Sequence, residues 1–354
     1  MLDVFENCFE KAEFIHLKKK VATLHYNVGL QLDGLQAISI LKIAATMFQQ
    51  IGDHTSIDAA QDAIKKKQMT IEWQVNELTL PTELYEKFLQ EIDACKERLT
   101  QLSKDGAVCA DLLSYLFDNH RLPLKQNIEK QSINIPITYL ITTVSAMTEG
   151  RSGYLNSIKE KEEHWIANIF NTVLFTYSLY KNYQILEWFI KQYGIDDLKN
   201  CLTGVYQKSI IYDEGREELI TIVIEKYLKN DIVGFVYSVI PQIEDSLKRL
   251  LENTGVSVCQ RDIQCLEDIP LNTILQNYKL ELINILGENF YDVLWLCFEY
   301  RFGLNVRNSL VHGGGLSYLN KQYALLLFFI IGFIFYRAYK LQMFDDQLER
   351  NFII

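Results

Sequence analysis

Proline and glycine, the residues that most often interrupt regular secondary structure, are scarce in this chain. Its 354 residues include 5 prolines and 17 glycines, while long stretches rich in Leu, Ile, Lys, Glu and Gln repeat their apolar positions with helical spacing. Such spacing is typical of amphipathic helices, and strands joined by tight turns would need more turn residues. We therefore predict an all-α fold.

Length and composition predict two folded units. Domains cluster at roughly 100 to 200 residues, so 354 residues exceed one ordinary helical core. Apolar residues make up 49% and charged residues 23%, which is typical of a globular protein. The helical pattern breaks at 193–197 and 213–215, so we expect a boundary near residue 205. The prediction is an N-terminal helical bundle or stack over residues 1–205 and a C-terminal helical bundle over residues 206–354.

The formal net charge of -10 argues against a surface that binds nucleic acid everywhere. Non-specific binding to nucleic acid grows with clustered Lys and Arg that neutralise phosphates. A local basic cleft remains compatible with the overall charge.

The cysteines show no pattern of a metal site. They are far apart, no CxxC pair occurs and no His lies at ligand spacing, so we expect neither a metal nor another cofactor. We interpret them as buried free thiols in a reducing cytoplasm, and the N-terminus lacks the basic start and apolar run of a signal peptide. The seven are Cys8, Cys95, Cys109, Cys201, Cys259, Cys265 and Cys297.

The most apolar stretch of the chain is YALLLFFIIGFIFY, at 323–336. A helix needs about 20 apolar residues to cross a bilayer, and shorter runs more often form core helices. We expect a buried helix and no membrane contact.

The segment RFGLNVRNSLVHGGG carries the most informative polar residues. We expect a helix over 304–312 that ends at His312, where the C-terminal end of the helix favours a protonated imidazole. One face of this helix either lines a wet cleft or is simply solvated, and the spacing fits both. Its four polar residues stand at i, i+3, i+4 and i+7: Asn305, Asn308, Ser309 and His312.

Arg307 lies about 140° around the same helix from His312, on an apolar side, and should be partly buried. A buried guanidinium cannot lose its proton and needs a partner. Glu244 is the best candidate, because it lies on the apolar face of a predicted helix over 231–253. We predict an Arg307–Glu244 ion pair, and we expect Pro241 to kink that helix and aim Glu244 at the motif.

The arrangement of Arg and Asn followed a few residues later by His and Gly resembles the HEPN superfamily (higher eukaryotes and prokaryotes nucleotide-binding). The motif NVRNSLVHG, with VIPQIEDSLK upstream, is similar to an uncharacterised branch in which a Pro-x-x-Glu helix precedes an NxRNxxxHG helix. The resemblance covers roughly residues 206 to 340. It implies a HEPN-like helical bundle at 206–354.

The resemblance also implies an activity: metal-independent cleavage of RNA through attack of the 2′-hydroxyl, leaving a 2′,3′-cyclic phosphate. His312 would transfer a proton, Arg307 would stabilise the charged phosphorane, and Asn308 would hold the phosphate or orient His312. Glu244 and Asn305 would support them. DNA, which lacks the nucleophile, should resist cleavage.

The partners follow from the same resemblance. One histidine cannot easily serve as both base and acid, so we expect a homodimer of the C-terminal domain, with contact through its last two helices. Residues 1–205 would then select the substrate or sense a signal. An RNA such as tRNA is the expected substrate, in a toxin-like or antiviral role to which a neutralising or sensing partner would belong.

Two other hypotheses stay open. A HEPN fold can serve as a non-catalytic RNA-binding, nucleotide-binding or assembly module, because one fold hosts several functions. Alternatively the motif only supports folding, in which case Arg307→Ala unfolds the domain and His312→Ala changes nothing.

Overall fold

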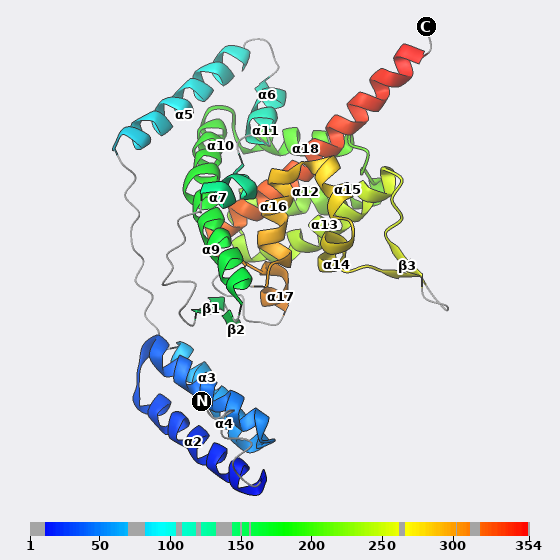
Figure 1. Ribbon diagram of the computed structural model, residues 1–354. Coiled ribbons are helices and arrows are strands. Elements are labelled where there is room, and N and C mark those ends of the chain that lie inside the picture. The colour runs from blue at the N-terminus through cyan, green and yellow to red at the C-terminus, as the bar shows by residue number, and fades with distance from the viewer. Residues whose placement is uncertain are drawn as a thin grey trace. The chain divides into compact units, whose positions relative to one another are not determined.

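A computed structural model describes residues 11–69, 82–103, 108–117, 122–131, 144–148, 151–155, 157–261, 266–301, 303–311 and 319–352. These residues are predominantly helical, which confirms the predicted all-α class (Figure 1). Two short antiparallel hairpins are the exception to the helical pattern among them. The first pairs β1 (Val144–Thr148) with β2 (Arg151–Leu155), and the second pairs β3 (Cys259–Arg261) with β4 (Leu266–Asp268).

The chain divides into two compact units, Met1–Leu80 and Pro81–Ile354. The described helices of the first unit are α2 (Lys11–Gln31), α3 (Gly34–Gln50) and α4 (His54–Met69). Ala22, Ala44 and Phe48 form a small apolar core between them. Close approach of α2 and α3 requires Gly29, because a Cβ at that position would lie 2.6 Å from the side chain of Leu41.

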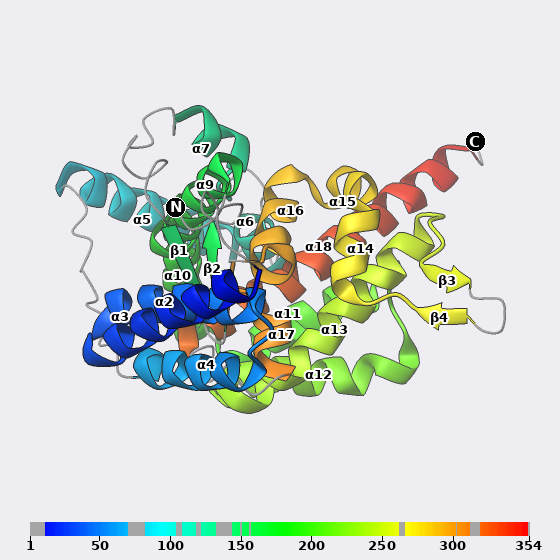
Figure 2. The same cartoon turned by 60° about the horizontal axis from the view of Figure 1, so that its bottom comes forward.

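The second unit contains the remaining described elements, and Figure 2 shows them from a second direction. Two of its helical stretches, η4 and η5, are π-helical turns that continue a preceding α-helix. Its helices are α5 (Thr82–Ser103), α6 (Val108–Leu116), α7 (Lys125–Gln131), α9 (Ile158–Val173), η4 (Leu174–Leu179), α10 (Tyr180–Tyr193), α11 (Ile195–Gln207), α12 (Glu214–Leu228), α13 (Ile232–Asn253), α14 (Leu271–Asn277), α15 (Lys279–Leu286), α16 (Glu288–Leu294), η5 (Trp295–Glu299), α17 (Val306–Val311) and α18 (Lys321–Phe352).

The boundary predicted near residue 205 does not coincide with this division. One core includes side chains from Phe88 in α5 to Ala338 in α18, and α11 contacts both α12 and α18. The two breaks in the helical pattern are helix ends within that core. Gly194, with φ of 99°, turns the chain between α10 and α11, and Asp213 caps the start of α12.

Helix α18 crosses the second unit and packs against α13 (Figure 1). Within Lys321–Phe344, an 18-residue window is apolar enough to span a membrane, with a mean hydropathy of 1.8, but 78% of that window is buried inside the protein. The ring of Phe333 stacks on Phe290 of α16 with centroids 3.8 Å apart. The predicted buried core helix is therefore confirmed.

The cysteine prediction is only partly correct. Cys95 and Cys297 are buried thiols outside any disulfide, whereas Cys201 in α11 is disulfide-bonded. Disulfide formation depends on which cysteines meet in space, and separation along the chain does not reveal this. The cysteine pattern is therefore no argument for a reducing compartment.

Candidate functional site

Helix α13 has two chemically different faces. Asp231 starts the helix by accepting a hydrogen bond from the amide of Gly234 at 2.9 Å. One face is mainly apolar and buried in the core, and it includes Phe235, Val239, Ile243, Leu247 and Leu250. The other face, displaced by about half a turn, carries the ionic residues that line a pocket. The core thus holds α13 rigidly while its polar face stays accessible.

The turn before α17 fixes where that helix begins. The amide of Leu304 donates to the carbonyl of Leu296 in η5 at 2.9 Å. A side chain at Gly303 is excluded, because its Cβ would lie 2.3 Å from the same carbonyl oxygen. Asn305 then adopts a left-handed backbone conformation, with φ of 46°, and α17 starts at Val306. These contacts place the first turn of α17, including Arg307, against η5.

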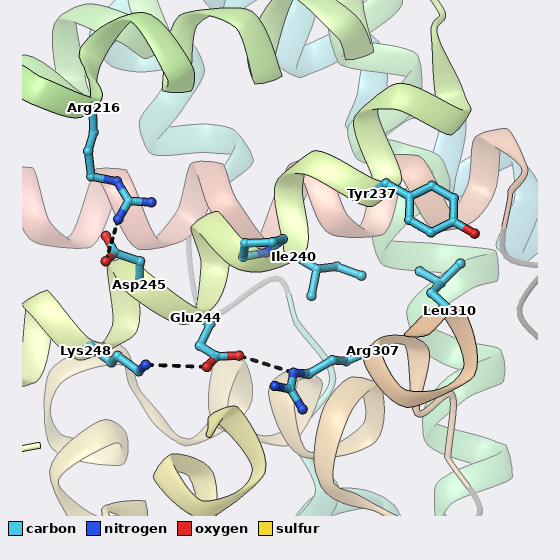
Figure 3. A pocket seen from close by; sticks show the side chains of 9 residues that line it. Arg216, Tyr237, Ile240, Glu244, Asp245, Lys248, Arg307 and Leu310 are labelled. Carbon is cyan, nitrogen blue, oxygen red and sulfur yellow. Dashed lines mark ion pairs between the residues drawn. The ribbon is translucent and has the colours of Figure 1, made fainter. Parts of the chain in front are cut away.

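A pocket of about 570 Å³ lies between α12, α13 and α17 (Figure 3). This volume is within the usual range for small-ligand sites. The lining residues are Arg216 from α12, Tyr237, Ile240, Pro241, Glu244, Asp245 and Lys248 from α13, and Arg307 and Leu310 from α17.

Glu244 forms ion pairs with two cations of the pocket (Figure 3). Its Oε2 lies 3.2 Å from Nε of Arg307, and its Oε1 lies 3.4 Å from Nζ of Lys248 one helical turn further on. The predicted Arg307–Glu244 ion pair is confirmed, and the Arg307 side chain is 32% exposed, so it is partly buried as expected. Among the described residues, the two terminal amino groups of Arg307 have no hydrogen-bond or ion-pair partner.

The neighbouring carboxylate, Asp245, forms a second set of ion pairs. Its Oδ1 lies 2.5 Å from Nη1 of Arg216, and its Oδ2 accepts from Nε of Arg249 at 2.8 Å. Arg249 also reaches Asp213 at the start of α12, at 2.7 Å. Burial would lower the pKa of Arg249, but its hydrogen bond to Asp245 and the negative charge of that carboxylate raise it. The network ties the start of α12 to α13, and Gln242 accepts a further hydrogen bond from Arg216.

The charges lining the pocket differ in sign from the protein as a whole. Three cations, Arg216, Lys248 and Arg307, face two carboxylates, Glu244 and Asp245, which leaves one formal positive charge in the pocket. The whole chain carries a net charge of -10. An anion entering this pocket meets guanidinium groups that the carboxylates hold in place, an arrangement suited to a phosphate.

The structure brings together only part of the predicted site. Arg307 and Glu244 meet at the pocket, whereas Asn308 is described only through its backbone in α17, and His312 lies outside the described residues. Asn305 is 4% exposed and precedes α17, so it does not belong to a polar face of that helix. The expected polar stripe is wrong at this position. The turn after Gly303 makes the helix begin at Val306 instead of residue 304, and the Asn305 side chain is buried in the interior.

Four of the charged or aromatic lining residues were not predicted as part of the site: Arg216, Tyr237, Asp245 and Lys248. Lys248 has a sequence signal, since it stands at i+4 from Glu244. Arg216 has none, because it comes from another helix. Pro241 lies within α13, and it deprives the carbonyl of Tyr237 of its usual helical donor. The expected kink stays a prediction.

Within the part of the chain that the structure describes, no group of three or more His, Cys, Asp or Glu side chains is placed to hold a metal ion. Comparison with known proteins finds no matching family model, no matching curated protein and no matching solved structure. The assignment of a function therefore rests on the sequence motif and on the pocket around Arg307.

Proposed function

We propose that this protein is a metal-independent endoribonuclease and that the pocket beside α17 binds the phosphate of its RNA substrate. The observation that carries the proposal is the Arg307–Glu244 ion pair at the edge of a pocket with excess positive charge. Glu244 contacts Nε and so leaves the terminal amino groups of Arg307 for a phosphate oxygen. His312 is the next residue in the chain after the last residue of α17, Val311.

The proposed reaction transfers two protons and needs no external nucleophile. His312 accepts the proton of the 2′-hydroxyl, whose oxygen attacks the adjacent phosphorus. The bond from phosphorus to the 5′-oxygen breaks, and this oxygen takes a proton from a second, protonated histidine. Arg307 stabilises the added negative charge on the phosphorane, and Asn308 holds the phosphate or orients His312. The products are a 2′,3′-cyclic phosphate and a 5′-hydroxyl.

The second histidine would come from a second copy of the chain, so the proposal includes a homodimer. The apolar stretch of α18 between Ala324 and Ala338 is buried within its own chain and offers little surface to a partner. The dimer contact would therefore use α17 and its surroundings. We further propose a cytoplasmic location and a toxin-like or antiviral role on a cellular RNA such as tRNA, controlled by a neutralising or sensing partner.

The test compares purified wild type with His312→Ala and Arg307→Lys on total RNA in EDTA. His16→Ala is the matched control, because His16 is an exposed histidine of the first unit. We expect cyclic-phosphate ends from wild type and from the control, and at least a hundredfold slower cleavage by the other two variants. Equal cleavage by all four proteins would reject the site. Binding of RNA without cleavage by wild type would instead indicate a non-catalytic module.

A further inference from the structure

The pocket beside α17 has an apolar end and an ionic end (Figure 3). Tyr237, Ile240 and Leu310 lie together at the first, and Glu244, Lys248 and Arg307 lie toward the second. Tyr237 and Glu244 are seven residues apart on one helix, which separates them by about 10 Å along the axis of α13. The pocket thus offers an aromatic surface and a cation within the dimensions of one nucleotide.

Tyr237 is the aromatic residue of this pocket, and its side chain is 50% exposed. Within the described residues its ring packs on no other aromatic ring and its hydroxyl has no hydrogen-bond partner. An exposed tyrosine is common on protein surfaces, but this one lies with Ile240 and Leu310 at the apolar end of a pocket whose other end carries the cations. Aromatic rings placed next to a cationic groove are a recurrent platform for unpaired bases.

We propose that the pocket binds one unstacked nucleotide, with its base on the ring of Tyr237 and its phosphate on Arg307. The inference rests on the proposed function and assigns the residue that holds the substrate beside the scissile phosphate. Ile240 and Leu310 enclose the apolar edge of the base, and Lys248, which is tied to Glu244, adds positive charge near the phosphate.

Two consequences follow for the ligand. A base can reach Tyr237 only when it is unpaired and unstacked from the nucleic-acid duplex. A single strand should therefore bind better than the same sequence in a duplex. Neither stacking nor the contact with Arg307 involves the 2′-hydroxyl. A single-stranded DNA of the same sequence therefore occupies the pocket and inhibits RNA cleavage without being cut itself.

The experiment measures binding with a ligand that the protein cannot cleave. A fluorescently labelled single-stranded DNA of about ten nucleotides is titrated at low salt, and its affinity is read from fluorescence anisotropy. The proteins are wild type, Tyr237→Phe, Tyr237→Ala and Tyr85→Ala. Tyr85 is the matched control, because it is an exposed tyrosine on α5 and does not line the pocket.

We expect roughly tenfold weaker binding for Tyr237→Ala, from the loss of stacking on one base. Tyr237→Phe keeps the ring and should bind like wild type, as should Tyr85→Ala. The inference is overturned if Tyr237→Ala binds as tightly as wild type, if the labelled strand binds better as a duplex, or if wild type binds neither form.

Cleavage of RNA by the same proteins separates this inference from the proposed function. If wild type cleaves RNA while Tyr237→Ala binds and cleaves equally well, the nuclease proposal survives and the stacking role of Tyr237 fails. If Tyr237 governs binding while wild type leaves RNA uncut, the nucleotide pocket stands and the proposed catalysis fails.

Discussion

The Nε of Arg307 on α17 lies 3.2 Å from Oε2 of Glu244 on α13, and this contact joins the two walls of the pocket. The orientation matters because a guanidinium bound through Nε leaves the edge formed by its two terminal amino groups open to another acceptor. Lys248 approaches the second oxygen of the same carboxylate. Glu244 is therefore the residue that sets the position of both cations.

Removal of Arg307 should lower stability moderately and should not unfold the protein. Arg307→Ala leaves Glu244 with Lys248 as a remaining partner, and the pair is partly exposed, so we expect a loss of about 1–2 kcal/mol. Urea denaturation measures it, with the exposed Arg98→Ala as control. Complete unfolding of Arg307→Ala would instead show that this arginine is a structural residue.

Glycine at 303 should be essential to the position of α17. Gly303→Ala forces a methyl group against the carbonyl of Leu296, so we expect a loss of about 2 kcal/mol or more and a fall in any RNA cleavage. Gly204→Ala is the control, since a Cβ there meets no atom within 4 Å and alanine suits the interior of α11. The control should be neutral or stabilising by about 0.5–1 kcal/mol.

The buried carboxyl of Asp292 should make stability depend on pH. Burial is the main cause that raises its pKa from 3.8 to about 6. The hydrogen bond from the amide of Lys125 acts in the opposite direction and lowers this pKa. The folded state therefore holds this proton more tightly than the unfolded state, and stability falls as the pH rises from about 4 through 6.

Asp292→Asn keeps the size of the side chain and removes the charge. Relative to wild type it should gain stability as the pH rises, by up to about 3 kcal/mol at pH 7, and the gain should vanish below about pH 4. Urea denaturation across this range measures the difference, with exposed Asp93→Asn as control. A difference between Asp292→Asn and wild type that does not change with pH would contradict the raised pKa.

The apolar stretch of α18 should behave as core. Phe333→Ala removes a ring stacked on Phe290, and we expect a loss of about 3–5 kcal/mol in urea denaturation. Phe344→Ala, on the same helix but 60% exposed, should change stability by less than about 0.5 kcal/mol. Similar effects of the two substitutions would argue against a buried helix.

Local patterns in the sequence predicted much of the architecture. Apolar residues with helical spacing and few glycines or prolines were sufficient for the all-α class, because helices form from contacts between near neighbours in the chain. The buried part of α18 followed from its length and composition. The Arg307–Glu244 pair was predicted because both charges lie on apolar helix faces, where each charge needs a partner of opposite sign.

What the sequence by itself determined was the helical class, the core helix and one ion pair across the pocket. Only the tertiary structure decided which helices share that pocket, because Arg216 reaches it from α12, whose packing against α13 depends on contacts distant in the chain. It also decided that Asn305 turns inward and that the units divide between Leu80 and Pro81. The breaks near residue 205 are helix ends inside one core, and a local pattern cannot distinguish a helix end from a domain boundary.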